Sequence, residues 1–358
     1  MGFDRVRRRC GAALTALVGV CVATGASASQ TPADSTPPRA PDRLFEATEP
    51  LDLTLKADFG AINKNRGNEK RDQPAVLSYV TAAGDTVALD VQLHTRGHFR
   101  LARCQYPPLK VVFNREQTPH TTFAHQGSLK LTVQCRGGQG YANYLLEEYL
   151  IYRAYNLLTD RSFRVRLARV SYVDVNGKHA PEMRRAFFVE DDDRMARRNA
   201  THVIDQKGLS QGDVDVEQMG VAVVFQYMIG NTDWAVSALH NIVLTEDSTG
   251  VVYPVPYDVD WSGVISTPYA QPDPRLNLPN VRQRAFRGMC RSPQDLATLF
   301  ARFNARKDTI YTLYRGMAAE GLEAKRISQA LDYYDEFFKT INDPGRTRRE
   351  FILACPRS

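Results

Sequence analysis

Two short stretches in the second half of the chain concentrate side chains that can bind metal ions or move protons. The first holds Asp233 and Asn241, and the second holds Asp258 and Asp260. Carboxylate and amide oxygens are the ligands that Mg²⁺ and Mn²⁺ prefer in proteins. The pattern therefore predicts a metal-binding and catalytic loop over residues 230–263, with Asn241, Asp258 and Asp260 as metal ligands.

The residues between these stretches favour a β-hairpin. Apolar runs at 242–244 and 251–253 flank the turn sequence 247–250, so the groups that enter and leave the hairpin should meet at one end. Asp258 and Asp260 then share a strand face, and their like charges repel unless a cation or an arginine lies between them. Taken singly, each of these polar residues could instead cap a turn or be solvated.

The first half of the chain supplies candidate partners for phosphate. Lys130 lies on a predicted strand, on the face opposite Leu129 and Leu131, and Glu147 and Glu148 lie on the helix that follows. A strand lysine followed by a helix glutamate is the pair that protein kinases use to hold nucleotide phosphates. An ordinary surface ion pair is the alternative interpretation.

Two further residues could bind the same phosphates. Lys110, in a Pro-Pro-Leu-Lys segment, is a rival to Lys130. Arg96, next to Gly97, could bring a guanidinium and backbone amides to phosphate oxygens. An ordinary glycine turn would explain the same residues.

The elements that must position these groups follow from hydrophobic periodicity. Strands are predicted at 51–55, 75–80, 86–91, 109–113, 129–133, 166–175 and 185–189, and helices at 142–158, 214–230, 293–319 and 322–341. This order predicts an α+β protein with a strand-rich first half (44–192), which contains one internal helix. A helical second half (193–358) carries the acidic hairpin.

The N-terminal residues predict export. A cluster of arginines precedes an apolar run over 12–23 and a small-residue cleavage site after Ala28, which is the pattern of a secretory signal peptide. Residues 1–28 are therefore expected to be removed, and the Pro-rich segment 29–43 is expected to be a linker. The predicted location is periplasmic or extracellular, without a stable membrane anchor.

Composition narrows the class of protein. The 358 residues are 43% hydrophobic and 24% charged, which excludes a polytopic membrane protein, a collagen and a coiled coil. The formal net charge is +6, but part of it belongs to the arginines of the predicted signal. No pattern indicates a nucleic-acid-binding surface, and no nucleic-acid partner is expected.

The cysteines indicate disulfides. Four cysteines follow the predicted signal, and an even number in an exported chain is typical of disulfide pairing. Three pairings are possible. We favour Cys104–Cys135 with Cys290–Cys355, because each pair then stays within one predicted half. The spacings lack the CxxC pattern of a structural zinc site.

Several of these segments resemble motifs of the spore-coat protein H (CotH) kinase-like family, an atypical branch of the protein-kinase-like fold. The upstream matches are Arg96-Gly97 with the segment 107–110, the helix segment 144–150, and the segment 187–191, which is similar to the family's strand-to-hinge segment. The downstream matches are Asn231-Thr232-Asp233 with Asn241, and Pro256-Tyr257-Asp258-Val259-Asp260. The sequence departs from the family in having Tyr257 where a tryptophan is usual and in lacking a glycine-rich loop.

The resemblance implies a two-lobed protein-kinase-like fold and a set of roles. Asp233 would be the catalytic residue that accepts the proton of the acceptor hydroxyl, and residues 187–193, including Glu190, would form a hinge beside the adenine. Lys110 or Lys130 would touch the phosphates, with Glu147 or Glu148 as the orienting partner. Such chemistry depends on positioning and charge neutralisation.

The predicted function is therefore a secreted kinase-like enzyme that uses Mg²⁺ or Mn²⁺. It would transfer phosphate from a nucleotide, ATP by expectation, to a Ser or Thr of an exported protein. Two alternatives stay open. One is a catalytically inactive protein of the same fold that binds an envelope partner. The other is a metal-dependent hydrolase, for which His240 is the local candidate for a catalytic histidine.

Overall fold

The computed structural model describes residues 42–67 and 71–355. The predicted signal peptide (1–28) and all but the last two residues of the predicted linker (29–43) lie outside these ranges. None of the helices within the described ranges combines the length and apolar composition needed to cross a membrane.

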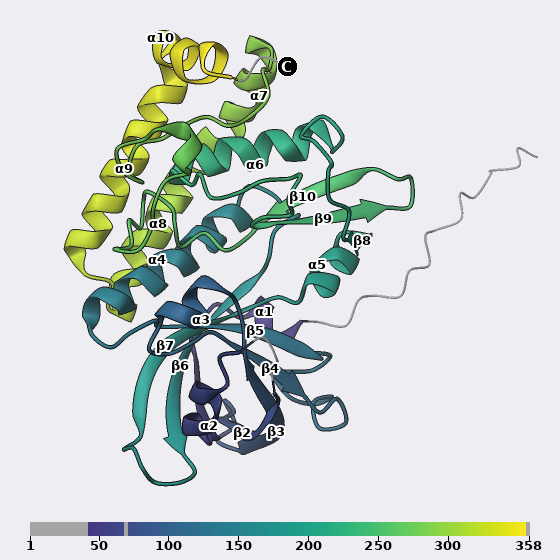
Figure 1. Ribbon diagram of the computed structural model, residues 1–358, viewed down its shortest axis with the longest axis vertical. Helices are drawn as coiled ribbons and strands as arrows, with labels where there is room; N and C mark the ends of the chain where they lie inside the picture. The colour runs from purple at the N-terminus through teal and green to yellow at the C-terminus, as the bar shows by residue number, and fades with distance from the viewer. Residues whose placement is uncertain (1–41, 68–70, 356–358) are drawn as a thin grey trace, which may run out of the picture. The chain divides into compact units, whose positions relative to one another are not determined.

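Seven strands form a closed barrel (Figure 1). Its interior is filled by buried apolar side chains. They are β1 (Leu51–Ala57), β2 (Gln73–Val80), β3 (Thr86–Thr95), β4 (Leu109–Phe113), β5 (Ser128–Val133), β6 (Val165–Asp174) and β7 (Glu182–Val189). Alternate residues point inward, as in Leu109, Val111 and Phe113 of β4, which are all buried. The residues between them, such as Lys110, lie on the outer face.

Closure of the barrel contradicts the predicted two-lobed kinase-like fold with its strand-rich N-lobe. The strand order is β1-β2-β3-β4-β5-β7-β6, and β1 pairs with β2 on one side and with β6 on the other. The β1–β6 pairing is parallel and matches Leu51 with Ala168. A pairing between segments so distant in the sequence leaves no local pattern. The strands of the barrel were therefore predicted, but the predicted architecture was wrong.

The remaining helices and strands cover the barrel and build a second core. The short N-terminal helices are α1 (Arg43–Glu46), α2 (Phe59–Lys64) and α3 (Phe99–Arg103), and α4 (Gln139–Asn156) and α5 (Asp192–Arg198) follow. The C-terminal helices are α6 (Val216–Ile229), α7 (Pro293–Asn304), α8 (Lys307–Gly316), α9 (Ala324–Asn342) and α10 (Pro344–Thr347). Helix α4 packs against β6 and β7 and also against α8 (Figure 1). Its burial on nearly all sides explains its apolar sequence.

The predicted acidic hairpin is confirmed. Strands β9 (Ile242–Asp247) and β10 (Val252–Pro256) pair antiparallel, and β8 (Thr201–Ile204) extends them to a three-stranded sheet. The register pairs Ile242 with Pro256, so Asn241 and Tyr257 lie side by side where the hairpin opens. The predicted long helix over 293–319 is divided at residues 305–306 into α7 and α8.

Both favoured disulfides are present. Cys104 is bonded to Cys135, with Cα atoms 4.7 Å apart, and Cys290 is bonded to Cys355, with Cα atoms 5.1 Å apart. The Cys104–Cys135 disulfide joins the residue after α3 to the loop that follows β5. Two disulfides are typical of a protein outside the reducing cytoplasm.

Candidate active site

A pocket of about 720 Å³ collects most of the polar residues singled out in the sequence. Its lining comes from the outer face of β3–β5, from α3, and from the residues before β9 and after β10. The charged and polar side chains that line it are His94, Arg96, His98, Arg100, Lys110, Lys130, Asp233, His240, Asn241, Asp258 and Asp260. The basic groups come from the barrel and α3, and the acidic groups come from the loops on either side of the β9–β10 hairpin.

The basic wall results from the pairing of three strands. His94 of β3 is opposite Lys110 of β4, and Lys110 is opposite Lys130 of β5. Lys110 and Lys130 are like charges placed directly opposite each other on neighbouring strands, which destabilises a sheet. His94 Nδ1 is instead paired with Asp72, 2.7 Å away. Within the described residues, Lys110 makes no hydrogen bond or ion pair. The strand pairing therefore holds the Lys110 charge at the pocket wall, where the charge of Asp191 attracts it without a hydrogen bond or ion pair.

Arg96 adds a second cation next to this wall. Its Nη2 donates to Thr132 Oγ1 at 3.0 Å, and its buried Nε has no partner in the described part of the chain. Burial lowers the pKa of Arg96, although an arginine still stays charged at any physiological pH. A cation with an unused donor beside a pocket is suited to bind an anion.

Lys130 does not form the predicted pair with a glutamate of α4. Its Nζ lies 2.5 Å from Asp192 Oδ1, at the start of α5, and 5.2 Å from the centre of the Tyr257 ring. Glu148 is instead paired with Arg100, and Glu147 with Arg326 of α9. The sequence could not show this, because both partner arginines come from segments distant from α4.

On the acidic side, Asp233 is held between two neighbours. Its Oδ1 lies 2.7 Å from His240 Nε2, and its Oδ2 accepts a hydrogen bond from Asn241 Nδ2 at 3.0 Å. A neutral His240 that donates its Nε2–H to Asp233 leaves Nδ1 as an acceptor. This is the arrangement of the His–Asp pairs that act as general bases in enzymes. Because the side chains of His240 and Asp233 are 54% and 29% exposed, a ligand can reach them.

The backbone at two of these residues adopts the left-handed conformation. Asn241 has φ 54° and Asp258 has φ 52°, a conformation that costs a non-glycine residue roughly 1–2 kcal/mol. Specific contacts hold both. The carbonyl of Asn241 accepts the Tyr257 N–H at 3.0 Å, and the N–H of Asp258 donates to Tyr152 Oη at 2.8 Å.

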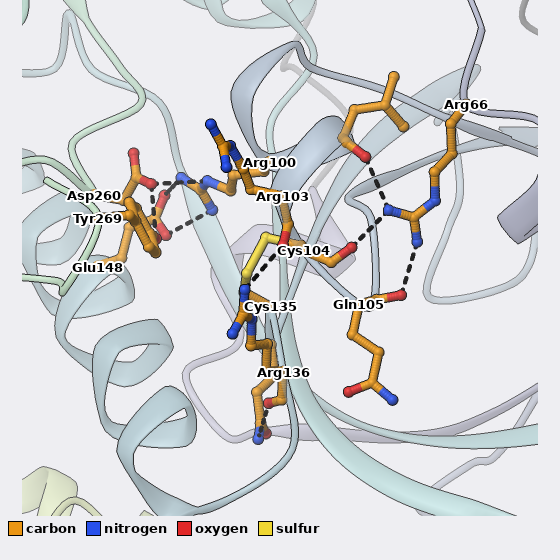
Figure 2. Close-up of a disulfide and its surroundings, with 12 residues drawn as sticks. Arg66, Arg100, Arg103, Cys104, Gln105, Cys135, Arg136, Glu148, Asp260 and Tyr269 are labelled. Atoms are coloured by element: carbon orange, nitrogen blue, oxygen red, sulfur yellow. Dashed lines mark hydrogen bonds and ion pairs between the residues drawn. A yellow bond between two sulfur atoms is a disulfide. The ribbon is translucent and has the colours of Figure 1, made fainter.

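Arg100 lies among three carboxylates, as Figure 2 shows in part. It forms a bidentate pair with Glu148 at 3.0 and 2.7 Å, and its Nη2 lies 2.7 Å from Asp258 Oδ1. Its Nε lies 3.0 Å from Asp260 Oδ2. The cation that the adjacent Asp258 and Asp260 require is thus an arginine of the chain itself.

Helix α3, which carries Arg100, is fixed at its C-terminal end (Figure 2). The Arg66 guanidinium donates to the carbonyls of Leu101, Cys104 and Gln105 at 2.9, 2.6 and 2.8 Å. These contacts satisfy carbonyls that a helix end leaves without partners. Together with the Cys104–Cys135 disulfide they hold a five-residue helix that would be unstable alone.

Burial and charge set the protonation of the three carboxylates. Burial raises the pKa of Glu148 to about 7 and that of Asp260 to about 6, against the opposing effect of Arg100. Burial also opposes ionisation of Asp258, but the charges of Arg100 and Arg96 outweigh it and lower its pKa. Asp258 is therefore the carboxylate that stays ionised, and its side chain is 44% exposed.

The predicted metal ligands fit only part of a metal site. Oxygen atoms of Glu148, Asp258 and Asp260 lie within 4.8 Å of one another, a spacing that could hold an ion, but Arg100 already binds all three. Asp260 is directed to Arg100 and to Tyr269 Oη, 2.9 Å away. Asp258, whose side chain is 44% exposed despite its contact with Arg100, and Asn241 remain accessible to a ligand in the pocket. Two such ligands suit a Mg²⁺ or Mn²⁺ that arrives with phosphate oxygens, and do not suit an ion held by the protein alone.

Three predicted nucleotide-binding residues lie outside the pocket lining. Glu148, which is paired with Arg100, is one of them, and Glu190 and Glu147 are the others. Glu190 is fully buried and accepts hydrogen bonds from Arg198 at 3.1 and 2.9 Å, a pairing internal to the fold. Glu147 is buried and accepts from Arg326 Nε at 3.0 Å. Burial raises the pKa of Glu147 to about 8. We assign Glu190 and Glu147 to the packing of the fold.

Sequence reasoning missed Arg100 and gave His240 little weight. The repulsion between Asp258 and Asp260 indicated that a cation was needed, but α3 is too short to produce a helical pattern that would point to Arg100. His240 is adjacent to Asn241 in the sequence. Its position beside a candidate metal ligand was the available signal.

No family model matches the chain, and a search of the curated proteins found no match.

Proposed function

We propose that this protein transfers a phosphoryl group from a nucleotide, with ATP as the expected donor, to a Ser or Thr hydroxyl of an exported protein. The observation that carries the proposal is the pocket that faces Lys110, Lys130 and Arg96 toward Asp233 and Asp258. Phosphoryl transfer needs cations around the phosphates and a carboxylate beside the attacking hydroxyl. The motif resemblance to the CotH kinase-like family supports the same chemistry, and the proposal does not require a kinase fold.

Each group has a role in the proposed reaction. Arg96 and Lys110, which have unused donors, bind the phosphates, and Lys130 contributes charge although it is paired with Asp192. Asp258 and the side-chain oxygen of Asn241 would hold the Mg²⁺ or Mn²⁺ that accompanies the nucleotide. When bound, this ion would neutralise part of the phosphate charge.

Asp233 is the proposed base. As the acceptor hydroxyl oxygen bonds to phosphorus and the bond to the bridging oxygen breaks, the hydroxyl proton passes to Asp233, and the nucleoside diphosphate leaves. Contacts with His240 and Asn241 hold both oxygens of Asp233 in place.

His240 favours a second candidate function, a phosphoester hydrolase. The 2.7 Å contact between His240 and Asp233 would let His240 Nδ1 take a proton from water, so that water replaces the protein hydroxyl as the acceptor. The same cationic wall would bind the phosphate. The two functions differ in the acceptor and share the phosphate site.

Calorimetric titration of the oxidised protein with ATP, with and without Mn²⁺, tests the shared site. We expect Lys110→Met to weaken ATP binding by roughly 10- to 150-fold, because a hydrogen bond to a charged group contributes roughly 1.5–3 kcal/mol. Lys56→Met is the matched control, because Lys56 is an exposed lysine of β1 outside the pocket lining. Absence of ATP binding in the wild type with and without Mn²⁺ would refute the proposal.

Transfer from [γ-³²P]ATP to casein, compared with release of inorganic phosphate, separates the two functions. Kinase activity predicts labelled casein that is lost in Asp233→Asn and largely kept in His240→Gln. Hydrolase activity predicts phosphate release that is lost in both variants. Binding of ATP with neither product would leave a protein that binds nucleotide without catalysis and would refute both.

A further inference from the structure

A second cavity, separate from the candidate active site, lies at one end of the barrel. Its volume is about 270 Å³, and its walls come from α2, from the segment before β4, and from β5, β6 and β7. The apolar part of its lining is formed by Phe59, Ile62, Tyr106, Pro107, Leu109 and Val133. An apolar cavity of about 150 Å³ is large enough for benzene, so this one can hold a larger molecule.

Two polar atoms in this cavity lack partners. Tyr172 Oη and Arg184 Nη1 are both buried and have no hydrogen-bond partner in the described part of the chain, and both residues line the cavity. Arg184 is 7% exposed. A buried donor without a partner costs roughly 1–3 kcal/mol, and native structures contain few of them. Their shared position in one cavity indicates that a ligand satisfies them.

The surrounding charges define the kind of ligand. The Arg184 guanidinium is paired with Glu182 and stacks on the ring of Tyr106, so its charge is already compensated. Asp174, a buried carboxylate, lines the same cavity. The pairing of Arg184 with Glu182 and the nearby Asp174 carboxylate both disfavour an anion, whereas an uncharged oxygen can accept hydrogen bonds from Arg184 Nη1 and Tyr172 Oη.

We propose that this cavity, hereafter the barrel cavity, is a binding site for a small uncharged molecule with an apolar body and one carbonyl or hydroxyl oxygen. The apolar body packs against the rings of Phe59 and Tyr172, whose centres lie 5.3 Å apart, and the oxygen accepts from Arg184 and Tyr172. One wall includes Gln105, which follows Cys104 and is held by Arg66 (Figure 2).

Three probes of similar size test the proposal with the full chain, disulfides intact, by calorimetry and by NMR titration. They are acetophenone, which has the carbonyl, ethylbenzene, which lacks it, and benzoate, which is an anion. We expect acetophenone to bind about tenfold more tightly than ethylbenzene, because of its hydrogen bond to a charged donor, and benzoate to bind most weakly of the three.

Two variants locate the site. Tyr172→Phe removes one unpaired hydroxyl and should reduce the preference for acetophenone a few-fold without lowering the unfolding temperature of the free protein. Ala180→Trp places a large side chain at an exposed position of the lining and should abolish binding of acetophenone and ethylbenzene alike. Equal affinity for these two probes, tighter binding of benzoate, no binding at millimolar concentration, or unchanged binding in Ala180→Trp would each overturn the proposal.

Discussion

Replacement of Arg100 by methionine tests the electrostatic account of the site most directly. Methionine keeps much of the length of the side chain and removes its charge. Of the three carboxylates around Arg100, Glu148 and Asp260 are 5% and 7% exposed at their side chains, whereas Asp258 is 44% exposed. Removing one partner of a buried ion pair costs roughly 3–5 kcal/mol, while screening makes the exposed contribution small. We therefore expect Arg100→Met to lower the free energy of unfolding by an amount in this range at pH 8.

Arg100→Met should lower the free energy of unfolding more at pH 8 than at pH 5. The pKa of Glu148 is raised to about 7 and that of Asp260 to about 6, so both are largely ionised at pH 8 and largely protonated at pH 5. Arg100 then has fewer charges to neutralise at pH 5. The loss in Arg100→Met should shrink there to roughly 1–2 kcal/mol, the value of its hydrogen bonds.

Urea unfolding at both pH values, with the disulfides oxidised, measures these losses. Arg103→Met is the matched control, because Arg103 lies on the same helix α3 but is exposed and has no side-chain hydrogen bond or ion pair within the described residues. Its effect should stay within about 0.5 kcal/mol. A loss below about 1 kcal/mol for Arg100→Met at pH 8, or an equal loss at both pH values, would refute the reasoning.

Three further predictions use the same unfolding assay. Lys110→Met should leave stability unchanged or raise it by up to about 1 kcal/mol, because it relieves repulsion with Lys130; a clear loss would show that Lys110 has a stabilising partner. Replacing Cys104 and Cys135 by serine, which opens a loop of 31 residues, should cost roughly 3–4 kcal/mol, and no loss would contradict the role given to this disulfide. Burial raises the pKa of Glu147 from 4.5 to about 8, so the folded protein binds a proton at this carboxylate more tightly than the unfolded chain does. The stability that comes from this proton is full below pH 4.5 and is lost by pH 8. Glu147→Gln should therefore reduce the loss of wild-type stability between pH 5 and 8, and an unchanged pH profile would contradict this.

The sequence predicted local structure well because local structure depends on neighbouring residues. The alternation over 109–113 matches β4 at both ends, and the turn within 247–250 joins β9 to β10. The architecture could not be predicted in the same way. Closure depends on the parallel pairing of β1 with β6, and neither strand differs in sequence from one at an open edge. Short helices such as α3 are equally invisible, because five residues do not complete a hydrophobic period.

The candidate site shows a more specific limit. The predicted need for a positive charge near Asp258 and Asp260 is met by Arg100. The predicted strand face was wrong, because β10 ends at Pro256 and both carboxylates lie in the loop that follows. A divalent cation and a guanidinium both meet the need for a positive charge, and the acidic residues alone do not distinguish the two. The distinction depends on Arg100, which a short helix, the Arg66 contacts and one disulfide bring to the carboxylates. Because Arg100 contacts the same three carboxylates that a protein-bound metal would need, the metal that we propose is one that arrives bound to phosphate at Asp258.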